Sequence, residues 1–459
     1  MPAGIWKQHA NDCGTFKPYW FPQRLDHFNP GIFAEFQWFQ RYFVNDKYWD
    51  GSKTAPVFLY INGEGPVGGP PCLPTDEVVL LAQAHKGLIV TLEHRFYGES
   101  QPFNLTTTEN LMFLSSKQAL ADLADFRQFV AANWELADNV PFVTIGGSYS
   151  GALSAWFRIK YPHLTTMSIS SSGVVNAILN FTAFDAQVAT SAGPQCTEWL
   201  QSITAMLEER LSSSSSSNRQ TKAAFDVADM YDGDFYYLMA DAQATSVQYG
   251  FMTDMCGALA AAVNDNNNAV ATVASNDTAL WNAWVEYVNG FWKANLTPDF
   301  WSYATQDQVK LEPTPSRNYR PWWWQKCTEL AYFQVAPALN SVRSKHVTLE
   351  WHLQHCRDLF GEDLPLPPPT AETNTHYGGN KPAGTNIYFV NGSEDPWQHA
   401  SVPTSQSTVT QPCWRIDCDN CGHCVDLRGC PEGGCHPPSV LTDGRARIFA
   451  QIQSWLQAL

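Results

Sequence analysis

Short apolar runs alternate with an amphipathic stretch along the first third of the chain. Residues 56–61 and 87–92 are almost wholly apolar, and another apolar run covers residues 140–145. The amphipathic stretch lies between the last two runs, at about residues 116–134. Wholly apolar strands separated by helices are typical of a parallel sheet that helices cover on both faces. The pattern predicts an α/β fold.

The pattern of apolar and polar residues changes from about residue 190 to 338. Long helical patterns fill this segment, and no strand is expected in it. A six-serine run at residues 212–217 and an Asn-rich patch at 264–268 carry no apolar side chains to bury. We expect both to form exposed loops between helices.

A strand-like apolar run follows at residues 386–390, and an amphipathic helix is expected at about residues 443–459. The core is therefore predicted to come in two parts, residues 1–189 and 339–459. A helical cap insertion, residues 190–338, interrupts it.

Composition narrows the class of protein. The 459 residues carry 28 Lys and Arg against 44 Asp and Glu, a formal charge of −16, and only 16% are charged. Such a chain folds, and it has no concentrated Lys/Arg run with which to bind phosphates. It also has no stretch of about 20 apolar residues, the length that crosses a bilayer. We therefore expect neither nucleic acid nor a membrane as a partner.

Cysteines and glycosylation sequons indicate the secretory route. The chain has twelve cysteines. Five Asn-x-Ser/Thr sequons begin at Asn104, Asn180, Asn276, Asn295 and Asn391, of which the first four are our candidate glycosylation sites. The first residues lack the basic and then apolar pattern of a signal peptide. We expect a mature chain whose leader is missing, secreted or delivered to a lysosome or vacuole; a cytosolic protein with reduced thiols is the alternative.

The sharpest local feature surrounds Ser148. An apolar strand runs into small residues on either side of this serine, and a helix follows at once. That is the context of a nucleophile elbow, in which a strained turn holds the serine hydroxyl clear of the sheet. Gly146 fits the pattern G-x-S-x-G, but Ser150 replaces its second glycine. A plain Gly/Ser-rich helix entry is the alternative interpretation.

A nucleophilic serine needs a histidine base, which a carboxylate orients. In α/β-hydrolases these residues follow in the order Ser, Asp, His. Asp395 comes just after the late strand at residues 387–390 and is the candidate acid, with Glu394 as its neighbouring competitor. Asp395-Pro396 alone would also suit a plain turn.

Three histidines follow Asp395 in the chain: His399, His423 and His436. His423 lies in a loop before the last predicted helix, where this fold requires the base. We therefore select His423 as the base and interpret the other two as structural.

Acyl transfer also needs backbone N–H groups that face the developing oxyanion. One donor is expected to be the N–H of Tyr149, directly after the nucleophile. The second would come from the loop Gly63-Glu64-Gly65, which leaves an early strand and in which glycine permits close backbone approach. These glycines would equally suit a simple turn.

Nine blocks of sequence together resemble the prolyl-carboxypeptidase family of serine peptidases. They lie at residues 23–28, 40–42, 63–65, 93–100, 146–149, 160–163, 324–329, 391–397 and 422–424. The resemblance implies an α/β-hydrolase core interrupted by a helical cap domain. It also implies that Ser148 is the nucleophile, Asp395 the orienting acid and His423 the base.

The family resemblance further implies cleavage next to proline. A proline ring is rigid, apolar and without an N–H, so its pocket should be a flat hydrophobic slot. Trp322, Trp323 and Trp324 are candidate lining residues, with burial in the core as the alternative.

The predicted function is a serine peptidase that acts on peptides, as an exopeptidase with preference for proline-adjacent bonds. The alternatives are a carboxylesterase of the same fold and a catalytically silent binding protein. We expect no cofactor and no metal; peptide substrates are the expected partners, with a homodimer as a further option.

Half of the cysteines crowd around the proposed base, at positions 413, 418, 421, 424, 430 and 435. We expect local disulfides that stiffen the loop of His423; the spacing Cys418-x-x-Cys421-x-x-Cys424 also resembles part of a zinc or iron–sulfur site. The other six are expected to tie the insertion and the N-terminal arm to the core: Cys13, Cys72, Cys196, Cys256, Cys327 and Cys356.

Overall fold

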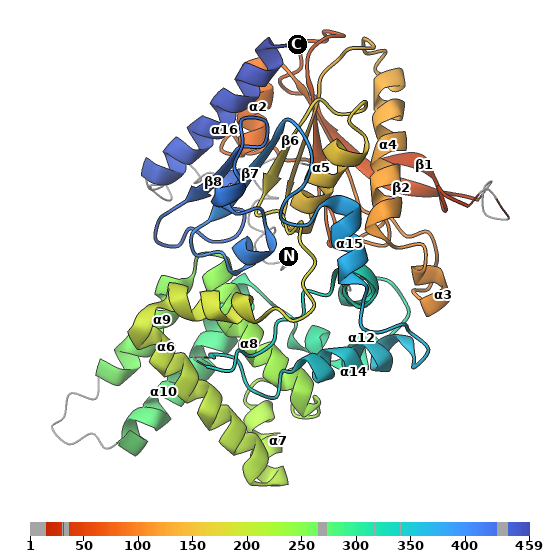
Figure 1. The fold of residues 1–459 in the computed structure, drawn as a ribbon. Coiled ribbons are helices and arrows are strands. Elements are labelled where there is room, and N and C mark those ends of the chain that lie inside the picture. The colour runs from red at the N-terminus through yellow and green to blue at the C-terminus, as the bar shows by residue number, and fades with distance from the viewer. Residues whose placement is uncertain are drawn as a thin grey trace.

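A computed structural model gives the fold of the protein (Figure 1). It describes residues 15–29, 31, 36–264, 273–314, 318–339, 341–428 and 439–459, without the side chains of residues 264 and 273–276. One half of the molecule combines a sheet with helices, and the other half is built of helices (Figure 1).

Eight strands of the described residues form one sheet, in the order β1-β2-β4-β3-β5-β6-β7-β8. β1 pairs antiparallel with β2, and β2 antiparallel with β4, whereas the remaining neighbours are parallel. The strands are β1 (Tyr19–Arg24), β2 (Gln37–Asn45), β3 (Val57–Ile61), β4 (Leu88–Leu92), β5 (Phe142–Gly147), β6 (Met167–Ser171), β7 (Ile387–Gly392) and β8 (Cys413–Ile416).

Helices cover both faces of this sheet (Figure 1). On one face α2 (Glu77–His85) and α16 (Ser439–Gln457) pack apolar side chains against the strands. On the other face α4 (Ser116–Asn133) and α5 (Tyr149–Lys160) do the same. Because both faces are covered, the central strands β4 and β5 are buried along their whole length, as their apolar runs predict.

The core is an α/β-hydrolase fold, which confirms the predicted fold class. A mostly parallel sheet carries helices on both faces, and β5 leads directly through Ser148 into α5. The predicted strands at residues 56–61, 87–92 and 386–390 are confirmed as β3, β4 and β7.

All further helices between β6 and β7 belong to an insertion that packs beneath the sheet (Figure 1). They are α6 (Thr182–Ser213), α7 (Ser215–Ala223), α8 (Asp232–Gln248), α9 (Met252–Asn264), α10 (Val273–Tyr287), η1 (Val288–Trp292), α11 (Lys293–Asn295), η2 (Phe300–Tyr303), α12 (Thr305–Gln308), α13 (Tyr319–Gln325), η3 (Lys326–Leu330), α14 (Leu349–Phe360) and α15 (Thr370–Tyr377). Short helices outside it are α3 (Thr108–Leu111), η4 (Pro396–Ala400), η5 (Thr404–Gln406) and η6 (Val425–Leu427).

The helical stretch is longer than the sequence indicated. Its first helix begins at Thr182, so the expected division at residues 189 and 190 falls inside α6. The expected division at residues 338 and 339 falls between η3 and α14, and α14 and α15 follow it. The prediction of an exposed loop at the serine run is wrong: α6 extends to Ser213, and α7 begins at Ser215, with the hydroxyl of Ser214 accepting a hydrogen bond from the N–H of Ser217. A serine that caps a helix in this way needs no apolar partner. Residues 265–268 of the Asn-rich patch lie outside the described residues.

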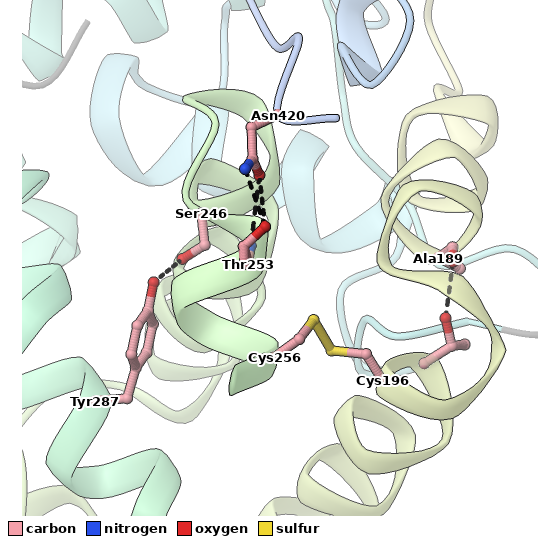
Figure 2. Close-up of a disulfide and its surroundings, with 8 residues drawn as sticks. Ala189, Cys196, Ser246, Thr253, Cys256, Tyr287 and Asn420 are labelled. Atoms are coloured by element: carbon pink, nitrogen blue, oxygen red, sulfur yellow. Dashed lines mark hydrogen bonds between the residues drawn. A yellow bond between two sulfur atoms is a disulfide. The ribbon is translucent and has the colours of Figure 1, made fainter. Parts of the chain in front are cut away.

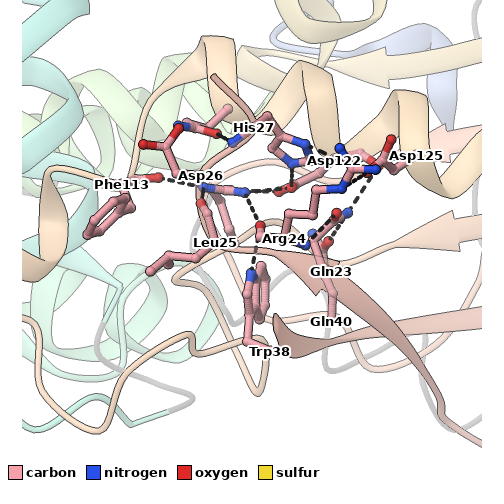
Figure 3. Close-up of polar contacts among 12 residues, drawn as sticks. Gln23, Arg24, Leu25, Asp26, His27, Trp38, Gln40, Phe113, Asp122 and Asp125 are labelled. Atoms are coloured by element: carbon pink, nitrogen blue, oxygen red, sulfur yellow. Dashed lines mark hydrogen bonds and ion pairs between the residues drawn. The ribbon is translucent and has the colours of Figure 1, made fainter. Parts of the chain in front are cut away.

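A buried polar network joins the first two strands to α4 (Figure 3). The guanidinium of Arg95 donates to both oxygens of Asp122, at 2.7 and 2.6 Å. The side-chain amide of Gln23 donates to the side chain of Gln40 and to the backbone carbonyl of Asp122. The antiparallel edge of the sheet is thereby anchored to the helix that covers it.

Two disulfides stabilise the insertion. Cys196 in α6 is bonded to Cys256 in α9 (Figure 2), and Cys327 in η3 to Cys356 in α14. The expectation that these cysteines tie the insertion to the core is wrong for both pairs, because all four of them lie within the insertion. Cys72 is also disulfide-bonded, and Cys13 lies outside the described residues. Within the described part of the chain, no helix is both long and apolar enough to cross a bilayer.

Candidate active site

Ser148 lies in a strained turn between β5 and α5. Its backbone has φ 62° and ψ −128°, a conformation that L-residues rarely adopt. The approach of strand and helix is close: a Cβ on Gly146 would lie 2.2 Å from the carbonyl oxygen of Ser150. The geometry is that of a nucleophile elbow.

The departure from G-x-S-x-G at Ser150 has a structural explanation. Its hydroxyl donates to the carbonyl of Gly147 at 2.7 Å and accepts from the N–H of the same residue at 3.1 Å. The side chain therefore folds back on the turn that carries Ser148, and the turn forms without a glycine at this position.

Asp395 and His423 form a buried hydrogen-bonded pair. Asp395 follows β7, and its Oδ1 accepts from the N–H of Trp397 at 2.9 Å. Its Oδ2 lies 2.8 Å from Nδ1 of His423, and both side chains are inaccessible to solvent. In the neutral imidazole, the carboxylate holds the proton on Nδ1 and leaves Nε2 as the acceptor.

The competing candidates lie elsewhere. Glu394 accepts a hydrogen bond from the backbone N–H of Asn420, at 2.8 Å. His399 lies 3.1 Å from the side-chain oxygen of Gln187 in α6. His436 lies outside the described residues.

Nε2 of His423 is buried and has no hydrogen-bond partner among the described residues. Burial alone would lower the pKa of this imidazole, but the carboxylate of Asp395 outweighs that effect and raises the pKa above its usual value. A buried polar atom without a partner costs stability, so its presence requires an explanation.

The loop of His423 packs against the elbow. The N–H of Cys424 donates to the hydroxyl of Ser172 at 2.9 Å, and the hydroxyl of Ser171 donates to Asp426 at 2.5 Å. The carbonyl of Ser171 in turn accepts from the N–H of Ser148 at 2.9 Å. The end of β6 thus joins the loop of the histidine to the turn of the serine.

The expected oxyanion donors lie beside the elbow. A Cβ on Gly63 would lie 3.4 Å from the N–H nitrogen of Ser150 and 3.7 Å from the ring of Tyr149. Tyr149 is the first residue of α5, so its N–H has no partner within the helix. Glu64 follows Gly63 in the same turn, in which the N–H of Gly65 donates to the carbonyl of Gly63.

The three tryptophans occupy different environments. Trp322 is half-buried, and its ring lies 5.7 Å from that of Tyr149. Trp323 is buried against Lys326 and His355, and Trp324 donates from Nε1 to the carbonyl of Leu114. Of the three, Trp322 is the one in ring contact with the residue that follows Ser148.

Comparison with known sequences gives the family. The profile described as serine carboxypeptidase S28 matches residues 23–443. The chain belongs to this family.

Relatives of this S28 chain match along almost its whole length. It is 40% identical to "Probable serine protease EDA2" of Arabidopsis thaliana, over 96% of the chain and 89% of that protein. It is 30% identical to mouse thymus-specific serine protease, with 96% and 88% covered, and 27% identical to human lysosomal Pro-X carboxypeptidase, with 96% and 89% covered. The protein is a serine-type peptidase, and its substrates are peptides.

The cysteines of the S28 chain follow the expectation only in part. Cys418 and Cys421 form a disulfide, whereas Cys413 and Cys424 are free and buried. The prediction of local disulfides is therefore wrong for these two, since Cys424 packs its sulfur against the elbow, 2.7 Å from where a Cβ of Gly147 would lie. Cys430 and Cys435 lie outside the described residues.

The sequons differ in accessibility. Asn104 and Asn180 are exposed, and Asn295 is half-buried with its amide donating to the carbonyl of Phe291. Asn391 is buried, and its amide donates to the carbonyl of Val402, so a glycan does not fit there. The side chain of Asn276 lies outside the described residues.

Sequence reasoning missed two groups beside the S28 site. One is Asp426, which holds the histidine loop to β6 through Ser171. The other is Gln248 at the end of α8, whose carbonyl accepts from the N–H of His423 at 2.6 Å. Asp426 is close to His423 in sequence and could have been considered, whereas nothing near Gln248 in the sequence indicates this contact.

Proposed function

We propose that this S28 peptidase cleaves peptides with Ser148 as nucleophile, His423 as general base and Asp395 as the group that orients the base. The observation that carries the proposal is the hydrogen bonding of the two ring nitrogens of His423. Its Nδ1 is bound to Asp395, while its buried Nε2 has no partner among the described residues. An imidazole held in this way is ready to accept the proton of a serine hydroxyl.

The chemistry would follow from these positions. Ser148 Oγ attacks the scissile carbonyl carbon and transfers its proton to Nε2 of His423. The N–H of Tyr149 and an N–H of the Gly63-Glu64 turn stabilise the oxyanion. The imidazolium then protonates the leaving amine, and a water molecule activated by the same imidazole releases the acyl group from Ser148.

We also propose that the enzyme is an exopeptidase that prefers proline-adjacent bonds. A relative with the printed name lysosomal Pro-X carboxypeptidase supports this preference. The helical insertion, which contacts the histidine loop, would limit access to the ends of peptides. Trp322 beside Tyr149 offers an apolar ring surface on which a proline ring would pack.

Secretion or delivery to a lysosome or vacuole is the proposed location. The disulfides of the described residues support it, since such bonds persist in oxidising compartments. The exposed sequons at Asn104 and Asn180 agree with it. A protein isolated from its source with free Cys196 and Cys256 and without N-glycans would contradict this location.

A fluorophosphonate probe tests the catalytic proposal directly. We expect the native protein to be labelled and Ser148→Ala to be unlabelled, with kcat lowered by about a millionfold. Ser154→Ala is the matched control, because Ser154 is a buried serine of the same helix α5 whose hydroxyl bonds Thr144 and Ser168. Labelling that persists in Ser148→Ala, or that is absent from the native protein, would refute the assignment.

Digestion of a mixed peptide library, read by mass spectrometry, tests the specificity. We expect cleavage one or two residues from a chain end and enrichment of proline next to the cut. Cuts spread through the interior of the peptides would contradict the exopeptidase, and faster hydrolysis of simple esters than of any peptide would favour the esterase alternative.

A further inference from the structure

One residue of the helical insertion contacts both catalytic turns. Gln248, the last residue of α8, is buried. Its backbone carbonyl accepts from the N–H of His423 at 2.6 Å, and its side-chain oxygen accepts from Nε1 of Trp397 at 3.0 Å. The backbone N–H of Trp397 donates in turn to Asp395. The turn of the acid and the loop of the base are therefore both joined to the same glutamine.

The backbones on the two sides of this contact lie very close together. A Cβ on Gly422 would lie 2.2 Å from the carbonyl oxygen of Gln248. Gly250, at φ +78°, has no room for a Cβ either, because the carbonyl oxygen of Asn420 would lie 2.8 Å away. Glycine is needed on both sides, so the contact admits little relative movement.

A second pair of contacts holds the corner of the insertion at which α8 leads into α9 (Figure 2). The hydroxyl of Thr253, at the start of α9, accepts a hydrogen bond from the side-chain amide of Asn420 at 2.9 Å and donates to the amide oxygen of the same residue at 3.2 Å. The disulfide between Cys256 and Cys196 then joins α9 to α6. The corner is thus fixed to the histidine loop on one side and to the longest helix of the insertion on the other.

We propose that Gln248 is a positioning residue for catalysis, which sets the separation of Asp395 and His423 by binding both of their turns. The inference rests on the proposed roles of these two residues. A catalytic pair tolerates little displacement, and an error of about 1 Å lowers the rate about a hundredfold. It follows that the corner formed by α8 and α9 is part of the catalytic apparatus and stays in place during turnover. Substrate must then enter elsewhere than between this corner and the loop of residues 420–424.

Gln248→Leu tests the proposal, because leucine has a similar size but cannot accept the indole N–H of Trp397. We expect kcat to fall about 10- to 100-fold while KM stays within about threefold of the native value. A merely structural role would lower the amount of folded enzyme and leave kcat per labelled active site unchanged. Active sites are counted with the fluorophosphonate probe.

Gln243→Leu is the matched control. Gln243 lies on the same helix, is equally buried and donates to the hydroxyl of Thr204, away from both catalytic turns. We expect this variant to lose stability to a similar degree and to keep kcat within about twofold of the native value. An equal kcat in both variants, or no change in either, would overturn the proposal.

If Gln248→Leu does not fold, Trp397→Phe removes the donor from the other side of the same hydrogen bond, with the same expected fall in kcat. A native kcat in Trp397→Phe would then overturn the proposal. These results are separate from the proposed function, which fails instead if the native protein itself is not labelled at Ser148.

Discussion

Asp122 and Asp395 are both buried carboxylates with a histidine and a hydrogen-bond network, yet the two networks end differently. Asp122 accepts two hydrogen bonds from Arg95 and lies 2.7 Å from Nε2 of His27. Asp395 accepts from a backbone N–H and from His423. The hydrogen bonds around Asp122 all end on other protein groups, whereas those around Asp395 end at Nε2 of His423, which has no partner in the described part of the chain.

The network around Asp122 is the more complete of the two. The remaining N–H groups of Arg95 donate to the backbone carbonyls of Arg24, Leu25 and Phe113, so all five of its donors are used. A satisfied network of this kind stabilises the fold and offers no reactive atom. Of these two carboxylate–histidine networks, only that of Asp395 leaves an imidazole nitrogen without a partner among the described residues, which is where a proton could be accepted.

The pKa shifts of the two networks run in opposite directions. Burial by itself would raise the pKa of Asp122, but the guanidinium of Arg95 lowers it below its usual value. The pKa of His423 is raised by Asp395 although burial opposes this. As the pH falls, His423 is therefore protonated at a much higher pH than Asp122.

Of the changes that test this comparison, Asp395→Asn should have the largest effect. The amide retains the shape of the carboxylate but no longer stabilises an imidazolium, so we expect kcat/KM to fall about ten-thousand-fold. The midpoint of thermal unfolding should move by only a few degrees. Steady-state kinetics combined with a thermal melt measures both, and a variant with native activity would remove Asp395 from the mechanism.

Asp122→Asn should show the opposite result. It leaves the buried guanidinium of Arg95 without its counter-charge, which typically costs about 3–5 kcal/mol of unfolding free energy. We expect kcat per labelled active site to stay within about twofold of the native value. Urea unfolding provides the free energy, and a loss of kcat without a loss of stability would contradict the structural role.

The smallest effect separates the two networks by pH alone. His423 must be neutral to act as a base, and its pKa is raised, so kcat/KM should fall about tenfold per pH unit as the pH drops below that pKa. The stabilisation by Asp122 is present above the unfolded carboxyl pKa and is lost only as the pH falls through its lowered folded pKa. From about pH 10, the raised pKa of His423, down to pH 5 we therefore expect a continuous, reversible loss of activity with an unchanged circular dichroism spectrum. Unfolding that accompanies the loss would contradict this order.

Much of the fold could be predicted because it depends on neighbours in sequence. The apolar runs of β3, β4 and β7 are visible, and so are the amphipathic pattern of α4 and the step from β5 through Ser148 into α5. β6 was missed because its serines resemble a loop. In the structure Ser168 and Ser170 are buried with their hydroxyls bonded to the side chain of Ser154 and the carbonyl of Gly151.

The candidate site, like the fold, could be predicted from the sequence only in part. The sequence selected Ser148, Asp395 and His423 through local patterns and the order of the family, and the structure bonds the last two to each other. It could not select among the cysteines, since pairing depends on where the loop of residues 413–424 folds. Cys424 lies against Gly147 of the elbow and is not disulfide-bonded within the described residues.

By itself, the sequence determined the apolar strands β3, β4, β5 and β7 and which family the chain resembles, because periodicity and short motifs act over a few residues. The tertiary structure decided which distant groups meet: Gln248 with His423, Ser171 with Asp426, and Arg95 with Asp122. Such contacts form between segments far apart in the chain, and their strength comes from burial and geometry that exist only once the sheet and the insertion have packed together.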